Sequence, residues 1–537
     1  MAIISPNTDL RLLSVPLTAG DGQQMDFATA AAQATYFQGK TVKTYADFTY
    51  QRKDQYIRVP EDAEKLYNCN YVMYRNTGHG TKWFYAFITK IEFINQNCAH
   101  IFIETDAFQT WLFDFSFKQC MVIREHTPTD NAYEHTLPEP IQTGDIREIY
   151  RYNALPFSIS AKTDTEFDAN YRVIFCLSEA YGNTELIANM FGGVPKSVYY
   201  YGVDRANVRA FTNAIVSAAL ADAIIAVYPV PIGGLTWTAV DNPPDNVPYY
   251  LPSDKARQTV TVSTPTGSTI SGVGNFKNKK MLCYPYHFYR LHSANGRSID
   301  IKPQDVNNIA STNQITFQSV FSGAVSPSLI ITPEYYRYNN YGTQSENGAN
   351  FDYSLDFTDF PQIAVKTDVY QNYIALNQSG ITLQKAQMIT GFIAGAAGLA
   401  AGSSAGLQSA AGSALSYAAK MSDMERIPDK VQGTVQGNAL LRSGLCGVFV
   451  SEMCVKQEYF ALADNYFTMY GYHVSELKVP QFKSRPNHNY LQTQNCDIVG
   501  DIPADDAKKL RGMFDSGLTV WHDPAHFGDY SRNNAPA

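Results

Sequence analysis

The chain has 537 residues, of which 45% are hydrophobic and 13% are aromatic, with 36 Tyr and 30 Phe. This composition excludes intrinsic disorder and favours a strand-rich fold, because flat aromatic side chains suit the half-buried surfaces of sheets. The formal net charge of -8 argues against a dedicated nucleic-acid-binding protein, because affinity for phosphates comes mainly from clustered Lys and Arg. At roughly 100–200 residues per domain, the length predicts three or four domains or one elongated multi-barrel body.

The eight cysteines stand singly along the chain and include no C-x-x-C pair. This spacing predicts neither a zinc site nor a dense disulfide scaffold, so we expect free thiols formed in a reducing cytosol. Residues 1–17 lack the basic start and the continuous apolar stretch of a secretion signal. The sequence therefore predicts synthesis in the cytoplasm without an export signal.

Residues 1–145 carry the strongest strand signals and are predicted to form an N-terminal β-rich domain. Two runs of aromatic and β-branched residues, 82–94 and 100–106, flank the Asn-rich stretch 95–97. Two such runs around a short turn predict a β-hairpin.

The middle region, residues 146–280, is predicted to mix helix and strand. Apolar residues in 207–227 fit a helical stripe, which Asp222 interrupts and which the prolines at 229 and 231 end. The charge and the prolines predict an ordinary packed helix rather than a membrane span. A strand is predicted at 259–262, within the loop-rich part that follows.

Strand-like patterns continue on both sides of a compositional break. Residues 281–385 are predicted to form a β-rich region, preceded by a small basic cluster of three lysines in 277–280. Residues 420–537 resume an aromatic, strand-like pattern. A helix is predicted at 504–514, because Pro503 and acidic residues stand at its start and Gly517 follows its end.

The segment 386–419 is the compositional outlier of the chain. Between Lys385 and Lys420 it holds no charged residue, and Ala, Gly and Ser dominate it. A transmembrane helix needs about 20 apolar residues to cross about 30 Å of hydrocarbon, so this segment is long enough to span a membrane. Its large apolar members are Met388, Ile389, Phe392, Ile393, Leu399, Leu407 and Leu415.

Glycines dilute the hydrophobicity of this segment, so a single copy is expected to insert weakly. The spacings Gly391-x-x-x-Gly395 and Gly398-x-x-x-Gly402-x-x-x-Gly406 place small residues on one helical face, where they let membrane helices approach closely. Several copies together are therefore predicted to be more stable in lipid than one. The glycines are Gly391, Gly395, Gly398, Gly402 and Gly406.

Two other interpretations of the segment stay open. A helical hairpin that bends at 402–404 would have arms of about 15 residues and about 22 Å, too short for a full span. Such a hairpin would enter the membrane partway or plug a channel. A flexible Gly/Ala/Ser loop in a soluble protein would normally carry some charge, so the missing charge favours membrane activity.

The usual sequence motifs of metal-dependent and phosphate-dependent enzymes are missing: neither H-E-x-x-H nor the P-loop is present. His522, Asp523 and His526 could be considered as metal ligands, but Pro524 disfavours the helix that would align the two histidines. Capping or core packing is the expected role of these residues. No metal and no cofactor are therefore predicted.

Glu134, His135 and Glu139 could be considered as an acid/base cluster. They lie in a Pro-flanked stretch, and scattered carboxylates in a loop are usually solvated. The chain is therefore predicted not to be an enzyme.

Sequence blocks near both ends of the chain resemble one known family. The N-terminal blocks are 15–17, 33–37, 70–76, 83–89, 108–114 and 122–126, and the C-terminal blocks are 464–472, 485–490, 517–522 and 528–531. Together they resemble the tail knob proteins of small, phi29-type short-tailed phages that infect Gram-positive bacteria.

The resemblance implies a mainly β fold with some helices, a β-rich α+β protein. Barrel-like domains at both chain ends, 1–145 and 420–537, would build a homohexameric ring or cylinder that continues the phage tail. The resemblance also implies a long hydrophobic loop in each subunit, held inside the tube before ejection and then released to form a membrane pore. The segment 386–419 occupies the place of this loop.

The resemblance also implies partners and a location. The chain would contact further copies of itself, other tail proteins such as the upper collar or connector and the tail tip, and host membrane lipid. DNA would pass through the lumen without specific binding. The expected location is the tail of the virion.

Two other functions compete with this prediction. One is a tail-associated cell-wall hydrolase, and the other is a pore-forming or fusion protein unrelated to phage tails. The missing secretion signal argues against a toxin, whereas a tail component is assembled in the cytoplasm and freed by lysis.

Overall fold

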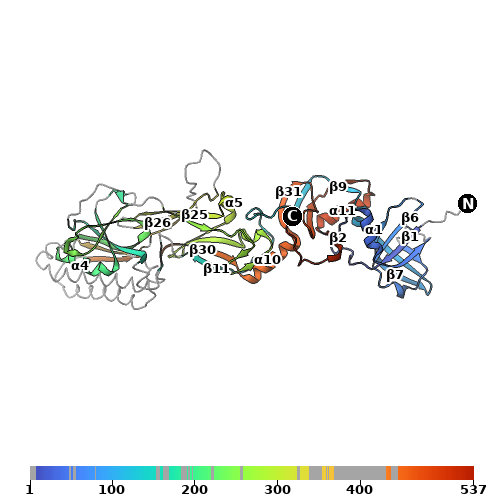
Figure 1. Cartoon of the computed structure of the whole chain (residues 1–537), viewed down its shortest axis with the longest axis horizontal. Coiled ribbons are helices and arrows are strands. Elements are labelled where there is room, and N and C mark those ends of the chain that lie inside the picture. Colours follow the sequence, from blue (N-terminus) through green and yellow to red (C-terminus); the bar gives the residue numbers. More distant parts are fainter. Residues whose placement is uncertain are drawn as a thin grey trace. The chain divides into compact units, whose positions relative to one another are not determined.

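The computed structural model is dominated by strands, with fewer helices between them, which confirms the predicted mainly β fold (Figure 1). It describes residues 8–536 except for 47–49, 52–55, 79, 153–157, 161–168, 183–189, 192–193, 196–197, 219, 221–222, 254–257, 323–326, 338–352, 359, 361, 368–430 and 437–444. The predicted membrane-active segment, 386–419, thus lies outside the described residues. Among the helices that are described, none is long and apolar enough to cross a membrane.

The chain divides into two compact units. Unit 1 consists of Met1–Thr143, Asn275–Met281 and Gln457–Ala537, and unit 2 consists of Gly144–Gly274 and Leu282–Lys456. Both chain ends therefore belong to unit 1, whereas the domains predicted from the sequence are consecutive stretches of the chain. The blue and red ribbons of unit 1 are accordingly interleaved in Figure 1.

The first sheet of unit 1 has seven strands in the order β3-β1-β6-β7-β8-β5-β4. Leu10, Leu12, Ile101 and Ile103 point to one face, because alternate residues of a strand share a face, and they form a buried core. β7 and β8 form the hairpin predicted from the sequence. The strands are β1 (Thr8–Leu13), β3 (Thr41–Ala46), β4 (Tyr50–Gln51), β5 (Tyr56–Val59), β6 (Tyr71–Asn76), β7 (Phe84–Asn95) and β8 (Cys98–Thr105).

The second sheet of unit 1 joins the two ends of the chain. Its order is β2-β34-β32-β10-β31, and β2 from the N-terminal part pairs in parallel with β34 from the C-terminal part. β9 (Phe115–Phe117) and β33 (Ile498–Gly500) pair beside it. The strands are β2 (Gln23–Met25), β10 (Cys120–Glu125), β31 (Tyr472–Lys478), β32 (His488–Gln494) and β34 (Leu518–Trp521).

Helices from both chain ends share one core with these strands. The helices are α1 (Ala30–Gln38), α2 (Ala107–Trp111) and α11 (Ala504–Ser516). Phe37, Phe108 and Phe514 are fully buried in this core, and the rings of Phe108 and Phe514 lie 6.2 Å apart. The predicted helix near the C-terminus is thus confirmed, with Pro503 at its N-cap and Gly517 at its C-cap.

Unit 2 contains three larger sheets. Their orders are β11-β30-β23-β24, β18-β19-β16-β13-β17-β28-β29 and β20-β25-β26-β27. β20 contains the strand predicted at 259–262. The strands are β11 (Ile146–Tyr152), β13 (Tyr171–Leu177), β16 (Tyr199–Val203), β17 (Ile224–Pro231), β18 (Thr236–Ala239), β19 (Tyr250–Ser253), β20 (Gln258–Ser263), β23 (His287–Ser293), β24 (Ser298–Ile301), β25 (Gln314–Ser322), β26 (Ser328–Pro333), β27 (Leu355–Phe357), β28 (Gln362–Thr367), β29 (Val431–Gln436) and β30 (Leu445–Val455).

The helix predicted at 207–227 is wrong in its second half. α4 (Val208–Ser217) ends early, and β17 follows at Ile224–Pro231. The apolar run of β17 lies between β13 and β28, so its hydrophobicity serves a buried central strand rather than a helical stripe. β28 pairs with β17 only at Ala226 and Val227. The pairing ends before Pro229 and Pro231, which have no backbone N–H to donate to a neighbouring strand.

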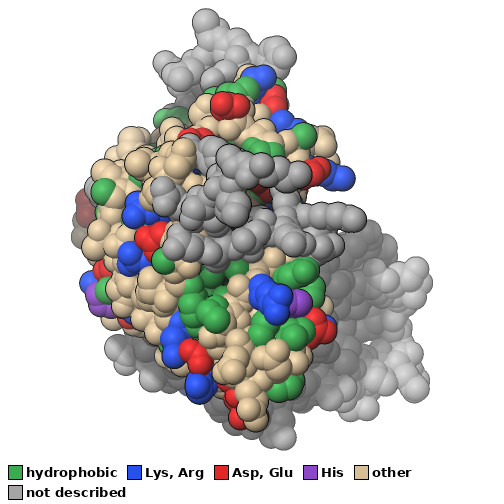
Figure 2. All heavy atoms as spheres, turned by 90° about the vertical axis from the view of Figure 1, so that its right-hand side faces the viewer, with side chains coloured by type: hydrophobic (Ala, Val, Ile, Leu, Met, Phe, Trp, Pro, Cys, Tyr) green, Lys and Arg blue, Asp and Glu red, His purple; other side chains and the backbone are tan. Residues whose placement is uncertain are grey.

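The surface mixes both signs of charge. In Figure 2, Lys and Arg side chains lie close to Asp and Glu side chains, and apolar side chains gather in the lower part of the face shown.

Every cysteine whose side chain is described is a buried free thiol, which confirms the prediction from cysteine spacing.

Two buried histidines of unit 1 share one acceptor. Nε2 of His126 lies 3.2 Å from the carbonyl oxygen of Thr468, and Nε2 of His488 lies 2.9 Å from the same atom. A carbonyl oxygen only accepts, so both Nε2 atoms carry hydrogen. Burial lowers the pKa of His126 well below its usual value and the pKa of His488 to about 4.

The titration of His488 should therefore destabilise unit 1 as the pH falls. Between about pH 6.5 and about pH 4 the unfolded chain protonates His488 and the folded chain does not, which costs about 3 kcal/mol of unfolding free energy. His488→Phe keeps an aromatic ring and removes this titration, so urea denaturation should show a weaker pH dependence for the variant. Asp106, whose pKa burial raises to about 6, acts in the opposite direction. Asp106 titrates in both the parent chain and His488→Phe, so the comparison of the two isolates His488. An equal pH dependence of the free energy of unfolding in both proteins would contradict the prediction.

A glycine with a left-handed backbone connects α10 (Gln457–Tyr470) to β31. Gly471 has a φ of 62°, and a Cβ there would press on the carbonyl group of Glu125 and lie 2.6 Å from His126 N. Gly528 has a φ of 82° and nothing within 4 Å of a Cβ. An alanine would strain the backbone at both positions, because both have a positive φ. Only at Gly471 would its Cβ also collide with neighbouring backbone atoms.

We expect Gly528→Ala to lower the free energy of unfolding by about 1–2 kcal/mol, through backbone strain alone. Gly471→Ala should lower it by roughly 2–5 kcal/mol, because overpacking against the β10 backbone adds to the same strain. Chemical denaturation of the full chain measures both values. A loss at Gly471 no larger than that at Gly528 would refute the close approach.

Candidate functional site

The sequence-predicted site residues fall into three groups. The membrane-active residues and the glycines of 386–419 lie outside the described residues. His526 Nδ1 lies 2.6 Å from Asp523 Oδ2, while His522 Nε2 contacts Asn489 Oδ1 at 2.9 Å. The two histidines therefore have different partners. The described part of the chain contains no group of three or more His, Cys, Asp or Glu that could hold a metal ion.

The predicted acid/base cluster separates into one exposed and one buried carboxylate. Glu134 is solvent-exposed and accepts hydrogen bonds from nearby backbone and side chains. Glu139 is not solvated as expected: its side chain is 1% exposed and forms ion pairs with Arg124 and Lys280. The prediction that Glu139 is solvated was wrong. Its loop sequence suggests exposure, but Arg124 of β10 and Lys280, 141 residues away along the chain, cover the carboxylate.

The basic cluster at 277–280 belongs to the short segment of unit 1, Asn275–Met281. Its backbone and side chains meet three acidic groups. Asp464 accepts from Lys277 N at 3.0 Å and from the Asn278 side chain at 2.9 Å. Asp130 accepts from Lys279 N at 3.3 Å, and Glu139 accepts from Lys280 Nζ. The segment is thus held by carboxylates from both chain ends, of which Asp464 and Glu139 are buried and Asp130 is half-buried.

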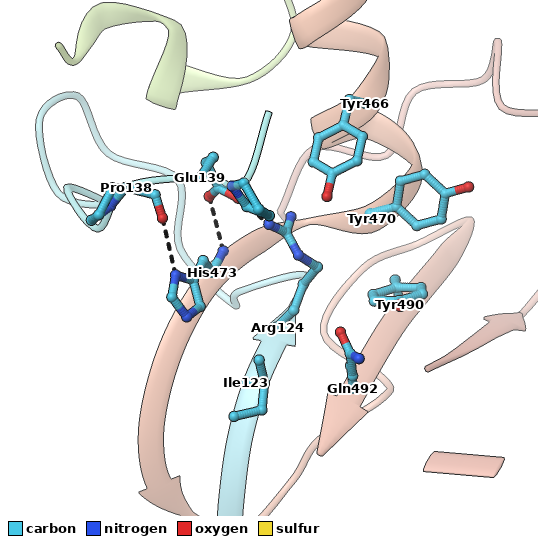
Figure 3. A pocket seen from close by; sticks show the side chains of 10 residues that line it. Ile123, Arg124, Pro138, Glu139, Tyr466, Tyr470, His473, Tyr490 and Gln492 are labelled. Carbon is cyan, nitrogen blue, oxygen red and sulfur yellow. Dashed lines mark hydrogen bonds and ion pairs between the residues drawn. The ribbon is translucent and has the colours of Figure 1, made fainter. Parts of the chain in front are cut away.

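Beside the ion cluster lies a cavity of about 640 Å³. Figure 3 shows its side chains: Arg124 rises from β10 toward Glu139, and three tyrosine rings stand on the opposite side. Tyr466 and Tyr470 come from α10, and Tyr490 comes from β32. The lining residues are Ile123, Arg124, Pro138, Glu139, Pro140, Tyr466, Tyr470, His473, Tyr490 and Gln492.

A second cavity of unit 1, of about 600 Å³, lies over Asp106. This carboxylate is 2% exposed and accepts from Tyr71 Oη at 2.8 Å, from Gln109 N at 3.1 Å and from the Gln24 side chain at 3.2 Å. Burial raises its pKa to about 6. Because its oxygens cap α2 and hold β2, Asp106 has a structural role. This role was not predicted from the sequence, although an Asp three residues before Gln109 at the end of a strand is a helix-capping signal.

Replacing Glu139 should be strongly destabilising. Glu139→Gln leaves Arg124 and Lys280 buried without their shared carboxylate, and breaking such a buried network costs roughly 3–5 kcal/mol. The matched control is Glu92→Gln, since Glu92 pairs at 3.1 Å with Lys90 but both side chains are exposed, and exposed pairs contribute little. Urea denaturation of the full chain compares the two. Equal losses would show that the cluster contributes no more than a surface pair.

Comparison with known proteins connects this architecture to phage tails. A family model for the C-terminal domain of the tail knob protein gp9 of Bacillus phage phi29 matches residues 255–535. A model for the N-terminus of the caudoviral major tail protein matches residues 6–116. In fold, the chain is similar to the tail knob protein gp12 of bacteriophage C1, with a TM-score of 0.66 at 13% identity over 99% of this chain and 100% of that one.

Curated relatives agree with the family match. The tail knob protein gp9 of Bacillus phage B103 is 27% identical, and that of phage phi29 is 26% identical; each alignment covers 98% of both chains. These relatives are named tail knob proteins, which confirms the resemblance seen in the sequence blocks and the expected location in the virion tail. With the knob model matching more than half of its residues, the chain belongs to the phi29-type tail knob protein family.

Proposed function

We propose that several copies of this chain form the distal tube of the phage tail, through which the genome leaves the virion. Residues 386–419 plug this tube and then enter the host cell membrane. The observation that carries the proposal is the segment itself: a tail component holds a long stretch without charge between Lys385 and Lys420. Family membership places the chain in the tail together with other phage proteins.

The apolar segment gives a physical reason for several copies to assemble. An apolar segment of this length exposed on a monomer would be an aggregation hazard. Identical copies arranged in a closed ring can hide the same segment against one another. We propose a homohexamer, with the upper collar or connector and the tail tip as neighbours.

The charge of the chain suits a conduit. Its net charge of -8 disfavours tight binding of the phosphate backbone, because such binding requires clustered basic groups that displace counterions. The lysines of Asn275–Met281 do not form such a surface, since Lys280 is buried and paired with Glu139. DNA would therefore slide past the wall rather than bind to it.

The same segment sets the conditions for membrane entry. Met388, Phe392 and Leu399 supply apolar surface, while glycines such as Gly395 and Gly402 allow helices to approach closely. A single helix this rich in glycine would insert weakly, so several copies would have to insert together.

Deleting 386–419 should separate assembly from membrane activity. The strand-rich ends of the chain hold the residues able to build large packed interfaces, so we expect the deletion variant to form the same ring as the full chain in mass photometry. Leakage of dye from liposomes and genome delivery should be lost. A variant that still permeabilises liposomes would show that the membrane role belongs elsewhere.

A two-residue change provides a sharper form of this test. Phe392→Asp with Ile393→Asp adds roughly 2.5–3.5 kcal/mol per aspartate at the centre of a membrane helix, and this penalty is repeated in every copy. The control, Phe392→Leu with Ile393→Leu, keeps the apolar surface and should keep leakage. If the aspartate variant leaks as well as the control, the segment is a linker or a plug only.

A further inference from the structure

The cavity of about 640 Å³ beside α10, from here on the tyrosine pocket, is lined on one side by three aromatic rings. The rings of Tyr466 and Tyr470 lie 5.1 Å apart, and the rings of Tyr470 and Tyr490 lie 5.2 Å apart at 88° to each other (Figure 3). Tyr470 is 37% exposed, so its ring is accessible from outside. Tyr490 turns its hydroxyl end toward Gly517, where a Cβ would lie 2.8 Å from Tyr490 Cζ. Tyr490 therefore contributes a ring rather than a hydroxyl group.

The rim of the pocket offers both hydrogen-bond donors and acceptors. His473 Nδ1 lies 3.0 Å from the carbonyl oxygen of Pro138, which only accepts, so Nδ1 carries the hydrogen. Gln492, paired with Arg124 across β32 and β10, adds an amide that both donates and accepts. The Tyr466 hydroxyl does the same.

The charged groups of the pocket are committed to the protein itself. Arg124 donates to Gly471 O at 2.8 Å and to Glu139, and its guanidinium lies over the Tyr466 ring at 5.0 Å. Glu139 also accepts from His473 N at 3.0 Å and from Lys280. A carboxylate or phosphate ligand would need a free cationic fork, which this arrangement does not present.

From the exposed Tyr470 ring and the mixed rim we infer that this pocket binds a neutral saccharide. A sugar ring has an apolar C–H face, which packs on the Tyr470 ring, and hydroxyl groups, which need donors and acceptors together. The cavity volume of about 640 Å³ falls within the range of small-molecule sites. Gln492 and the Tyr466 hydroxyl are the polar contacts.

This site is independent of the proposed membrane segment and adds a different contact with the host. A tail component with a saccharide site can bind a glycan of the cell surface. One such site would bind weakly, but repeated copies in an assembly raise the effective affinity without new contacts.

Titration of the full chain with maltotriose and with chitotriose, followed by ligand-observed NMR, tests the inference. At least one trisaccharide should bind saturably, with a Kd on the order of 1 mM. Tyr470→Ala should weaken binding about tenfold, the loss expected when one ring contact is removed. Tyr470→Phe keeps the ring and should lose less than Tyr470→Ala.

A surface tyrosine elsewhere in unit 1 is the matched control. Tyr67 is 66% exposed and lies apart from the lining residues, so Tyr67→Ala should leave binding unchanged. An unchanged melting temperature for Tyr470→Ala confirms that the variant is folded. Three results would overturn the inference: no saturable binding of either trisaccharide, equal binding by Tyr470→Ala, or preferential binding of glycerol phosphate or of a proline-rich peptide.

Discussion

Three carboxylates, the buried Glu139 and Asp464 and the half-buried Asp130, hold the segment Asn275–Met281 against both ends of the chain. Each carboxylate accepts from a backbone N–H or a lysine of this segment, and none of these hydrogen bonds is local in sequence. Burying an ionised carboxylate is unfavourable unless such partners are present. These hydrogen bonds therefore connect three distant stretches of the chain within unit 1, and the elements around them pack against this junction.

The apolar core of unit 1 also joins distant stretches of the chain. Phe37 and Phe108 from the N-terminal part pack with Phe514 from the C-terminal part, and the parallel pair β2–β34 joins the two ends within one sheet. Polar groups complete the junction, because Asp106 caps α2 and binds the β2 side chain Gln24. Aromatic packing and buried hydrogen bonds thus support one another, and a change in either affects both.

The tyrosine pocket is a consequence of how the ion cluster is built. Arg124 pairs with Glu139 and also binds the carbonyl of Gly471, the residue at which α10 turns into β31. This turn places Tyr466 and Tyr470 above β10, and it requires a glycine because the backbone of Glu125 lies so close. The pocket that we assign to a saccharide and the stability of unit 1 therefore share the same residues at their base.

Local sequence determined much about this protein. Residue pattern alone predicted the β7–β8 hairpin, the helix at 504–514, the free thiols and the tail knob family, because each depends on neighbours in the chain or on blocks read in order. The uncharged segment 386–419 is likewise evident from composition. Tertiary structure decided that Ile224–Pro231 is a strand and that Glu139 is buried. It also decided that Asp106 connects α2 to β2 and that three tyrosines line one pocket. Those properties depend on burial and pairing by residues up to several hundred positions away, which local pattern does not specify.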